Sequence, residues 1–176
     1  MHPLILSTVN SSLIPGTLIN KYRVPVFKVS MKFLFLLLSG LFLLSPPGWE
    51  LDFTKAKQTA SAERKMILIN FSGSDWCGPC IRMESDIFSS EAFSGYAKDH
   101  LVLVNADFPR LKKHALSKEQ EKKNEQLADA YNPKGVFPFT VLLTADGKIL
   151  KTWEGLPQLS AEEFTKQLQL TASAGK

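Results

Sequence analysis

The stretch from Met66 to Cys80 reads MILINFSGSDWCGPC, and the interpretation of the whole chain starts from it. It opens with an apolar run over residues 66–71 that ends at the polar residues 72–74, a pattern typical of a strand buried on both faces. Cys77 and Cys80 follow this strand directly. They stand at the start of a predicted helix, so two thiols are expected one helical turn apart.

Two thiols at this spacing can close a small disulfide and open it again. Cys77 lies where unpaired backbone N–H groups and the positive end of the helix dipole favour a thiolate, so its pKa should fall below that of a free cysteine. Cys80 lies a turn deeper, where it can attack a mixed disulfide on Cys77 and release the reduced partner. We therefore interpret Cys77 as the nucleophile and Cys80 as the resolving cysteine.

The rest of the chain predicts an α/β fold. Strand–helix–strand crossovers in the first half imply parallel pairing, and the turn residues 145–147 predict a hairpin in the second half. Ser160 and Glu163 form a capping box at the last helix. We expect a mixed central sheet with helices on both faces. The expected helices span residues 52–65, 77–88, 90–98 and 160–170, the strands span 66–71, 101–106, 139–144 and 148–153, and residues 109–126 form a loop running into a helix that ends near Tyr131.

Length and charge narrow the possible functions. The chain has 176 residues, of which 44% are apolar and 22% are charged, as expected for one domain with a buried core and a tail. The net charge of +4 belongs to the first 48 residues, because 17 basic and 17 acidic side chains follow them. Such a neutral body lacks the basic surface of a nucleic-acid-binding domain, so no nucleic acid partner is expected.

The first 48 residues predict export. Residues 33–44, FLFLLLSGLFLL, form an apolar run that follows Met31-Lys32 and precedes a helix-breaking Ser-Pro-Pro-Gly. The run is short for a membrane span and has the length of a secretory signal core. We interpret residues 31–48 as a signal peptide or signal anchor, residues 1–30 as a non-functional N-terminal extension, and residues 49–176 as the working domain. The expected location is periplasmic or extracytoplasmic, with residues 33–44 as a possible inner-membrane anchor.

Residues 72–80, SGSDWCGPC, resemble the active site of the thioredoxin family, and their prefix is similar to that of exported bacterial thioredoxin-like reductases, including the chlamydial periplasmic kind. The resemblance extends over roughly residues 50–172. It includes Asn-Ala-Asp at residues 105–107 and Gly-Val-Phe-Pro-Phe-Thr at residues 135–140. It implies a thioredoxin fold and thiol–disulfide exchange.

The resemblance also implies roles for individual residues. Trp76, Gly78 and Pro79 would form the active-site loop. Pro138 would follow a cis peptide bond and face the cysteines, and Phe137 would offer its backbone to an extended substrate peptide. From its chemistry alone, Pro138 is expected at the start of a strand, since it cannot donate a hydrogen bond within a central one. Trp76 is interpreted as a platform beside the site, although an ordinary half-buried aromatic residue would read the same way.

The chain departs from thioredoxins proper at the proton acceptor for the second cysteine. Thioredoxins carry a buried aspartate in the strand before the motif, and Asn70 stands nearest to that place here. An amide cannot act as a base, so Cys80 must lose its proton to water or to another carboxylate. Glu84, one turn beyond Cys80, is the residue that we interpret as a possible proton relay. The lysine of the next strand in cytosolic thioredoxins is replaced by Leu103.

We expect an exported thiol–disulfide oxidoreductase, and the Gly-Pro pair between the cysteines resembles that of reducing thioredoxins. The Cys77–Cys80 pair would itself be the redox group, so neither a dissociable cofactor nor a metal is expected. The partners would be disulfide-containing exported proteins and, as electron donor, a membrane thiol reductase. The domain is expected to be a monomer.

Two alternatives remain open at this point. The same chemistry could run as a disulfide oxidase or isomerase, or the domain could be a non-catalytic thioredoxin-fold binding module or metal chaperone. His100 and His114 are the other soft ligands, but their spacing matches no zinc-finger pattern, and neither has a visible partner. A purely structural Cys77–Cys80 disulfide would close a loop too short to stabilise much. Asp75 is expected to be an exposed loop residue, and the basic side chains of residues 110–123 a solvated helical face.

Overall fold

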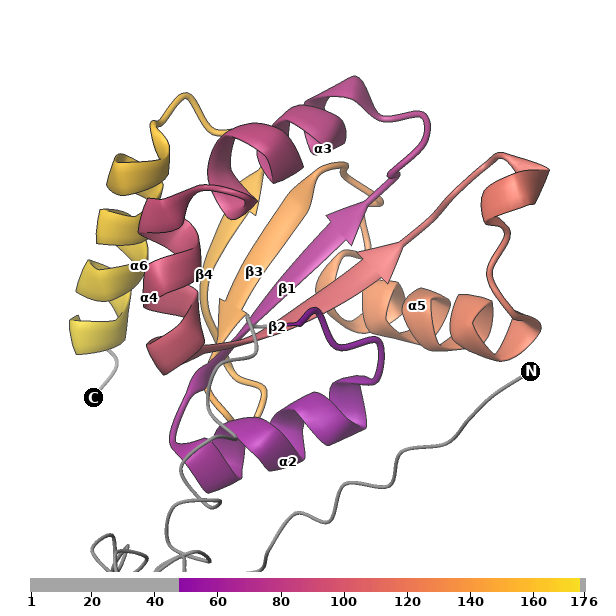
Figure 1. The fold of residues 1–176 in the computed structure, drawn as a ribbon. Coiled ribbons are helices and arrows are strands. Elements are labelled where there is room, and N and C mark those ends of the chain that lie inside the picture. The colour runs from indigo at the N-terminus through magenta and orange to yellow at the C-terminus, as the bar shows by residue number, and fades with distance from the viewer. Residues whose placement is uncertain (1–47, 175–176) are drawn as a thin grey trace, which may run out of the picture. The chain divides into compact units, whose positions relative to one another are not determined.

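A computed structural model describes residues 48–174, so the predicted extension and, apart from Gly48, the predicted leader lie outside the described residues (Figure 1). Four strands form one sheet in the order β2-β1-β3-β4. β1 is parallel to β2 and antiparallel to β3, and β4 is antiparallel to β3, which confirms the mixed sheet. The strands are β1 (Met66–Ser72), β2 (Leu101–Asp107), β3 (Phe139–Leu143) and β4 (Ile149–Glu154).

Helices cover both faces of this sheet, as expected (Figure 1). α2 (Phe53–Glu63) and α5 (Lys118–Tyr131) pack on one face, and α3 (Gly78–Met83), α4 (Glu91–His100) and α6 (Ala161–Ala174) pack on the other. A 3-10 turn, η3 (Lys112–His114), lies between β2 and α5, and a π-helical turn, η2 (Glu84–Phe88), follows α3. None of the helices described in residues 48–174 is long and apolar enough to cross a membrane.

The alternation of side chains along β1 explains why its sequence is continuously apolar. Successive residues of a strand point to opposite faces. Ile67, Ile69 and Phe71 enter the core beneath α2 and α5, whereas Leu68 enters the core beneath α3, α4 and α6. Because helices cover both faces, both sets of side chains are buried, and the strand shows no alternation of apolar and polar residues.

Two helices differ from the predicted ranges for local reasons. The predicted helix 77–88 is α-helical only over α3, and the Ser89 N–H donates to the Glu84 carbonyl, at 2.9 Å, to close the π-helical turn η2. α5 ends at Tyr131, which confirms the predicted helix that ends near this residue, but it begins at Lys118, so the loop before it ends at residue 117 and not at 126. Only Asn124 and Leu127 are buried on α5, so its sequence lacks the repeated apolar residues that usually indicate a helix. Ser117 caps the helix by accepting from the Gln120 N–H, a capping pattern readable from the sequence.

Side chains also cap α2 and α6, and the capping box predicted for the last helix is confirmed. Asp52 accepts a hydrogen bond from the Lys55 N–H at the start of α2. Ser160 and Glu163 exchange hydrogen bonds at the start of α6, where the Ser160 N–H donates to the Glu163 carboxylate (2.8 Å) and the Glu163 N–H donates to Ser160 Oγ (3.2 Å). These pairs satisfy amide groups that the first helical turn leaves without partners.

Candidate active site

The strand register gathers three separate segments at one edge of the sheet. Phe71, at the end of β1, is paired with Ala106, at the end of the parallel strand β2, and with Phe139, at the start of the antiparallel strand β3. The loop after β1, the segment after β2 and the loop before β3 therefore meet at this edge. They carry the cysteine motif, residues 108–114 and the Phe137–Pro138 pair, respectively.

Cys77 and Cys80 form a disulfide at the start of α3, with their Cα atoms 5.2 Å apart. Cys77 is the N-cap of the helix, and its Sγ accepts a hydrogen bond from the Cys80 N–H at 3.2 Å. The two cysteines are 5% and 3% exposed, whereas Gly78 and Pro79 between them are exposed. After reduction, the Cys80 N–H would donate to a thiolate on Cys77, and such a donor lowers the pKa of a thiol.

The loop before β3 lies against the cysteine motif. The Phe137–Pro138 peptide bond is cis, and β3 starts at the next residue, as expected for a proline that cannot donate within a strand. The Phe137 ring packs edge-on against the Trp76 ring, with 5.6 Å between the ring centroids. In the described part of the chain, neither the N–H nor the C=O of Phe137 has a hydrogen-bond partner. The backbone before the cis-proline is therefore free to pair with a peptide.

Asn132 holds this loop in place and was missed from the sequence. Its side chain is buried, its Oδ1 accepts from the Val136 N–H (3.0 Å), and its Nδ2 donates to the Val136 carbonyl (2.9 Å). The residues Asn-Pro-Lys-Gly at 132–135 are a recognisable turn signal, and Gly135 has a positive φ of 61°. A turn at these residues could have been predicted from the sequence. The two hydrogen bonds between the Asn132 amide and the Val136 backbone could not.

Asp107, at the end of β2, ties the loop after β1 to its neighbour. Its carboxylate accepts three hydrogen bonds, from Ser72 Oγ (3.0 Å), the Ser74 N–H (2.8 Å) and Ser74 Oγ (2.6 Å). In the opposite direction, the Phe108 N–H donates to the Ser72 carbonyl at 2.8 Å. These contacts fix the path of the chain directly before the cysteine motif.

Asp75 makes the reciprocal contact, and the prediction of an exposed loop residue was wrong for its side chain, which is only 3% exposed. Its carboxylate accepts from the Arg110 N–H and the Leu111 N–H, both at 2.9 Å, and lies 3.0 Å from His114 Nδ1. The Arg110 N–H, with the help of Leu111 and His114, holds the pKa of Asp75 below its ordinary value against the opposing effect of burial.

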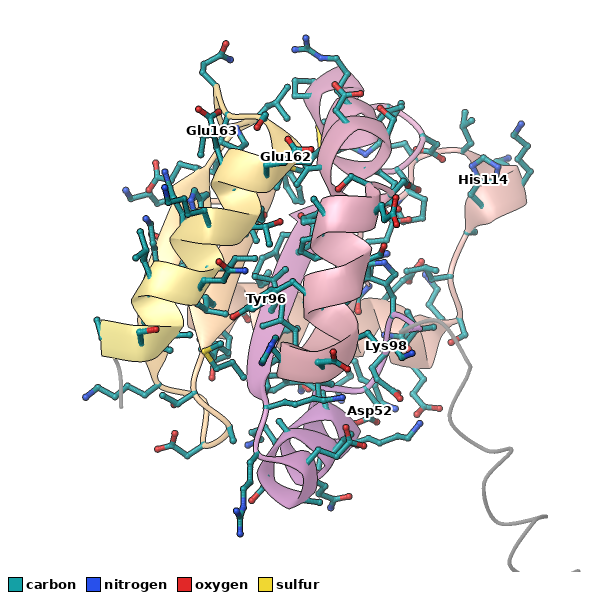
Figure 2. All side chains as sticks on the ribbon, turned by 60° about the vertical axis from the view of Figure 1, so that its left-hand side comes forward. Asp52, Tyr96, Lys98, His114, Glu162 and Glu163 are labelled. Carbon is teal, nitrogen blue, oxygen red and sulfur yellow. A yellow bond between two sulfur atoms is a disulfide. The ribbon has the colours of Figure 1, made fainter. Side chains whose placement is uncertain are left out.

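His114 therefore has a partner that the sequence did not reveal. His100, the second histidine of residues 48–174, stacks on Tyr96 in α4, with 4.5 Å between the ring centroids. Figure 2 shows His114 on the loop after β2, well separated from Tyr96. The structure thus places the two histidines on different elements.

Trp76 is half-buried and packed on several sides. Its indole N–H donates to the Phe108 carbonyl at 2.7 Å, and the Arg110 guanidinium lies 3.7 Å from its ring centroid. A Cβ added to Gly73 would lie 2.3 Å from the indole, so only glycine leaves room for it. Phe137 packs against both Trp76 and Phe108. The three segments at this edge therefore form one aromatic cluster.

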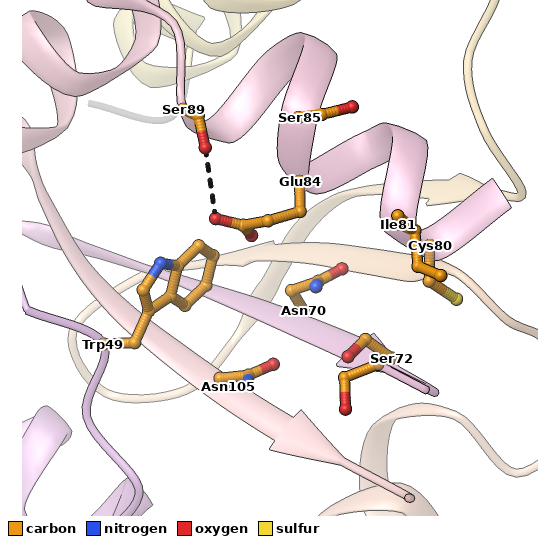
Figure 3. Close-up of a pocket in the computed structure, with 10 residues that line it drawn as sticks. Trp49, Asn70, Ser72, Cys80, Ile81, Glu84, Ser85, Ser89 and Asn105 are labelled. Atoms are coloured by element: carbon orange, nitrogen blue, oxygen red, sulfur yellow. Dashed lines mark hydrogen bonds between the residues drawn. The ribbon is translucent and has the colours of Figure 1, made fainter. Parts of the chain in front are cut away.

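A pocket of about 490 Å³ lies beneath α3 (Figure 3). Asn70 and Cys80 both line it, so the residue that stands nearest to the buried aspartate of thioredoxins does lie beside the second cysteine. Asn70 is buried, and its Oδ1 accepts from Thr140 Oγ1 at 3.4 Å. The pocket is further lined by Trp49, Ser72, Ser74, Ile81, Glu84, Ser85, Ser89 and Asn105.

Glu84 shares this pocket with Cys80 but does not touch its sulfur. Figure 3 shows the carboxylate turned toward Ser89 and away from Cys80, with the Asn70 amide between them. Partial removal from water raises the pKa of Glu84, against the opposing effect of a long 3.5 Å hydrogen bond from Ser89 Oγ. A carboxyl group of this kind binds and releases a proton closer to neutral pH than a fully solvated one.

A cysteine pair that opens a helix after the first strand, beside a cis-proline loop on a mixed sheet, defines a thioredoxin-like protein. The sequence model of the thioredoxin-like domain matches residues 53–172, and the chain belongs to this family. The resemblance read from residues 72–80 is therefore confirmed at the level of the family.

Particular relatives come from chlamydial redox systems. The chain is 38% identical over 102 residues to the disulfide bond reductase DsbH of Chlamydia pneumoniae, an alignment that covers 58% of this chain and 59% of DsbH. It is 32% identical over 60 residues to the thioredoxin-related protein DsbJ of the same organism, covering 34% of this chain and 17% of DsbJ. The matched segment thus spans about three fifths of the first relative and about a sixth of the second.

Solved structures show the same fold. A structure of DsbH oxidoreductase superposes with a TM-score of 0.66 at 27% identity, covering 90% of this chain and 95% of the other. A thioredoxin from Thermus thermophilus superposes with a TM-score of 0.55 at 19% identity, covering 75% and 95%. The second similarity concerns the fold alone.

Proposed function

We propose that the protein is an exported thiol–disulfide oxidoreductase that reduces disulfides in other exported proteins. The observation that carries this proposal is the Cys77–Cys80 disulfide at the N-terminus of α3, beside a cis-proline loop with an unpaired backbone. The similarity to a protein named disulfide bond reductase favours reduction over oxidation. The predicted leader, residues 31–48, is the basis for export.

The reaction runs in two exchange steps. The Cys77 thiolate attacks one sulfur of a substrate disulfide, and the other substrate sulfur leaves as a thiolate and takes up a proton. Cys80 then loses its proton and attacks the Cys77 sulfur, which releases the second substrate thiol and leaves the Cys77–Cys80 disulfide. The substrate gains the two electrons that the cysteine pair loses, together with two protons, one from Cys80 and one from solvent. A membrane thiol reductase would return them.

The backbone around the site suits this cycle. The Cys80 N–H donates to Cys77 Sγ and would stabilise the attacking thiolate. The unpaired N–H and C=O of Phe137 would pair with an extended substrate segment and bring its disulfide over Cys77. Pro138, at the start of β3, keeps this backbone from pairing within the sheet.

Glu84 is proposed as the proton relay for Cys80. Its carboxylate does not reach the sulfur, so the proton would pass through water in the shared pocket, whose volume of about 490 Å³ accommodates several water molecules. The raised pKa of Glu84 suits a group that takes a proton from Cys80 and later returns it to solvent. Asn70 lies between the two and can hold such a water by its amide group.

The first experiment measures reduction of insulin with dithiothreitol as the electron source. Cys77→Ser is expected to lower the rate to that of the uncatalysed reaction, because no thiolate is left to attack. Cys80→Ser is expected to accumulate mixed disulfides through Cys77. Ser173→Ala, at an exposed position of α6, provides a control without a lost thiol. Wild-type activity in Cys77→Ser would disprove the proposal.

The role of Glu84 is tested on the second step alone. A mixed disulfide on Cys77 is prepared with a chromogenic thiol, and its release by Cys80 is followed across pH. Glu84→Gln is expected to slow release by roughly tenfold, within the range known for proton transfer by side chains, and to remove one ionisation from the pH profile. Asp86→Asn, on the same turn, should leave both unchanged. An unchanged profile in Glu84→Gln would exclude the relay.

The direction of the reaction is tested by the equilibrium reduction potential of the cysteine pair. A value near roughly −270 mV, as in thioredoxin, supports a reductase that depends on imported electrons. A value near roughly −120 mV, as in strong periplasmic oxidants, would mean that the protein donates disulfides instead. Fractionation of cells that carry the full chain tests export separately.

A further inference from the structure

The segment after β2 presents a concentrated positive surface beside the disulfide. Between Asp107 and Glu119 the sequence contains no acidic residue, and Arg110, Lys112 and Lys113 are all exposed. Leu111 stands among them and is 46% exposed. We refer to residues 110–113 as the basic strip.

The basic strip is held at a fixed place relative to Cys77. Asp75, two residues before Cys77, accepts the N–H groups of Arg110 and Leu111, both at 2.9 Å. The 3-10 turn η3 follows directly, and His114 at its end lies 3.0 Å from the same carboxylate. The strip therefore moves with the active-site loop and cannot swing freely.

Arg110 is oriented by the active site itself. Its guanidinium lies 3.7 Å from the Trp76 ring centroid, in stacking contact with the residue next to Cys77. Within residues 48–174 this guanidinium donates no hydrogen bond to a protein acceptor. Its N–H donors are consequently available, and a stacked guanidinium loses little further freedom when it binds a carboxylate through two hydrogen bonds.

Two of the three lysines on α5 are paired with carboxylates, which sets the basic strip apart. On α5, Lys118 pairs with Glu121 (2.8 Å), and Lys123 pairs with Glu119 (2.9 Å) and Asp52 (3.1 Å). Among the residues that the structure describes, Lys112 and Lys113 form no ion pair. Lys122 has no ion pair among the described residues, but α5 as a whole contains three lysines and four acidic residues. The excess of positive charge is therefore next to the disulfide and not on the helix.

We propose that the basic strip is a docking surface for acidic polypeptide substrates, in which carboxylates flanking the reactive substrate cysteine bind Arg110, Lys112 and Lys113. The proposal rests on the proposed function, since it concerns the substrates of the same disulfide. Leu111 would contact an apolar side chain of the same segment. Opposite charges across such a surface raise the rate of encounter and select among partners of equal reactivity.

The test compares three peptides that contain the same strained disulfide and differ only in flanking Glu, Gln or Lys residues. The full chain, with dithiothreitol as reductant, is expected to show kcat/KM about tenfold higher for the Glu peptide than for the Gln peptide at low salt. High salt should bring the ratio close to one, because exposed charges are screened. The ratio is the readout, since a change in the reactivity of Cys77 would affect all three peptides equally.

Charge variants assign the selectivity to the strip. Lys112→Gln with Lys113→Gln should lower the Glu-to-Gln ratio to about twofold, and Lys112→Glu with Lys113→Glu should reverse the preference. Arg110→Gln should lower the ratio as well. Lys118→Gln with Lys122→Gln, which changes the same number of charges on α5, is the matched control and should keep the ratio of the wild type.

The outcomes separate this proposal from the proposed function. If no peptide is reduced, the proposed function fails; if all three are reduced equally well, only the docking surface is wrong. An equal loss of ratio in the α5 control would overturn the assignment to residues 110–113. Binding to vesicles of anionic phospholipid that is lost in Lys112→Gln with Lys113→Gln, without any peptide selectivity, would overturn it in favour of a membrane surface.

Discussion

Carboxylates near the disulfide stand in opposite environments, at the loops after β1 and β2, here called the front of the site, and in the pocket beneath α3, here called its rear. In front, Asp75 and Asp107 accept six short contacts between them, from backbone N–H groups, serine hydroxyls and a histidine. Behind, Glu84 faces the pocket that contains Cys80 and has one long hydrogen bond. Hydrogen bonds lower the pKa of Asp75, whereas loss of water raises that of Glu84.

This contrast indicates two tasks for acidic side chains around one reactive group. A carboxylate whose oxygens are all occupied stays ionised and fixes the backbone that it binds, so the front side determines where Cys77 stands. A carboxylate with few donors can change its protonation state, so the rear side suits proton exchange with Cys80. The predictions below test this division, beginning with the largest expected effect.

Removal of Asp107 should cost the most stability. Asp107→Ala leaves three donors of the loop, on Ser72 and Ser74, without their acceptor, and the free energy of unfolding is expected to fall by about 2 to 3 kcal/mol. Asp129→Ala, at an exposed position of α5, should change it by less than about 0.5 kcal/mol. Denaturant unfolding measures both. If both variants changed the free energy of unfolding equally, the hydrogen bonds to Asp107 would not contribute to stability.

A side chain added at Gly73 should cause the next largest loss of stability. In Gly73→Ala the new Cβ would lie 2.3 Å from the Trp76 indole, so the ring must move, at an expected cost of about 1 to 3 kcal/mol. Gly95→Ala in α4 meets nothing within 4 Å and should instead stabilise the protein by up to about 1 kcal/mol. Thermal unfolding compares the two variants. A stable Gly73→Ala variant with unchanged activity would contradict the tight packing of Trp76.

Lowering the pH should reduce the stability of the folded protein through protonation of Asp75. Its pKa is lowered from 3.8 on folding, so the unfolded chain binds the proton more tightly. The resulting stability is present above pH 3.8 and is lost as the pH falls through the lowered folded value. Denaturant midpoints between pH 6 and pH 2 should therefore fall less steeply in Asp75→Asn than in the wild type. Parallel curves would show that the Asp75 contacts do not depend on its charge.

Protonation of Glu84 should affect the pH dependence of stability in the opposite sense, and this effect should be the smallest. Its pKa is raised from 4.5 on folding, so the folded protein binds the proton more tightly, and the associated stability is present below pH 4.5 and is lost as the pH rises through the raised folded value. Glu84→Gln carries no charge and should lose less stability between pH 4 and pH 8 than the wild type does. A steeper loss in the variant would contradict the contrast between the two sides.

The elements that could be predicted depend on neighbours in the chain. The apolar runs of β1 and β2, the hairpin at residues 145–147 and the capping box at Ser160 act over a few residues, and all appear in the structure. The cysteine pair is local in the same sense. The end of α5 near Tyr131 was predicted but its start was not, because the helix buries little and its apolar periodicity is weak, although its capping signal at Ser117 was present.

The contacts that could not be predicted join residues far apart in the sequence. Asp75 is separated by 35 to 39 residues from the groups that it binds, and Trp76 by 32 from the carbonyl that accepts its N–H. The basic side chains of residues 110–123 were expected on one solvated helical face, but residues 110–113 precede α5. Only their attachment to Asp75 places them beside the disulfide. Likewise, Glu84 could be placed one turn from Cys80, but not turned away from it.

By itself, the sequence determined the class of chemistry and the order of elements, because a thiol pair at a helix start and alternating runs of buried strands are properties of short segments. The tertiary structure decided which groups surround the sulfur atoms. Parallel pairing of β1 with β2 and antiparallel pairing of β1 with β3 bring three distant loops to one edge. Hydrogen bonding and burial at that edge, which no single segment encodes, set the opposite pKa shifts of Asp75 and Glu84.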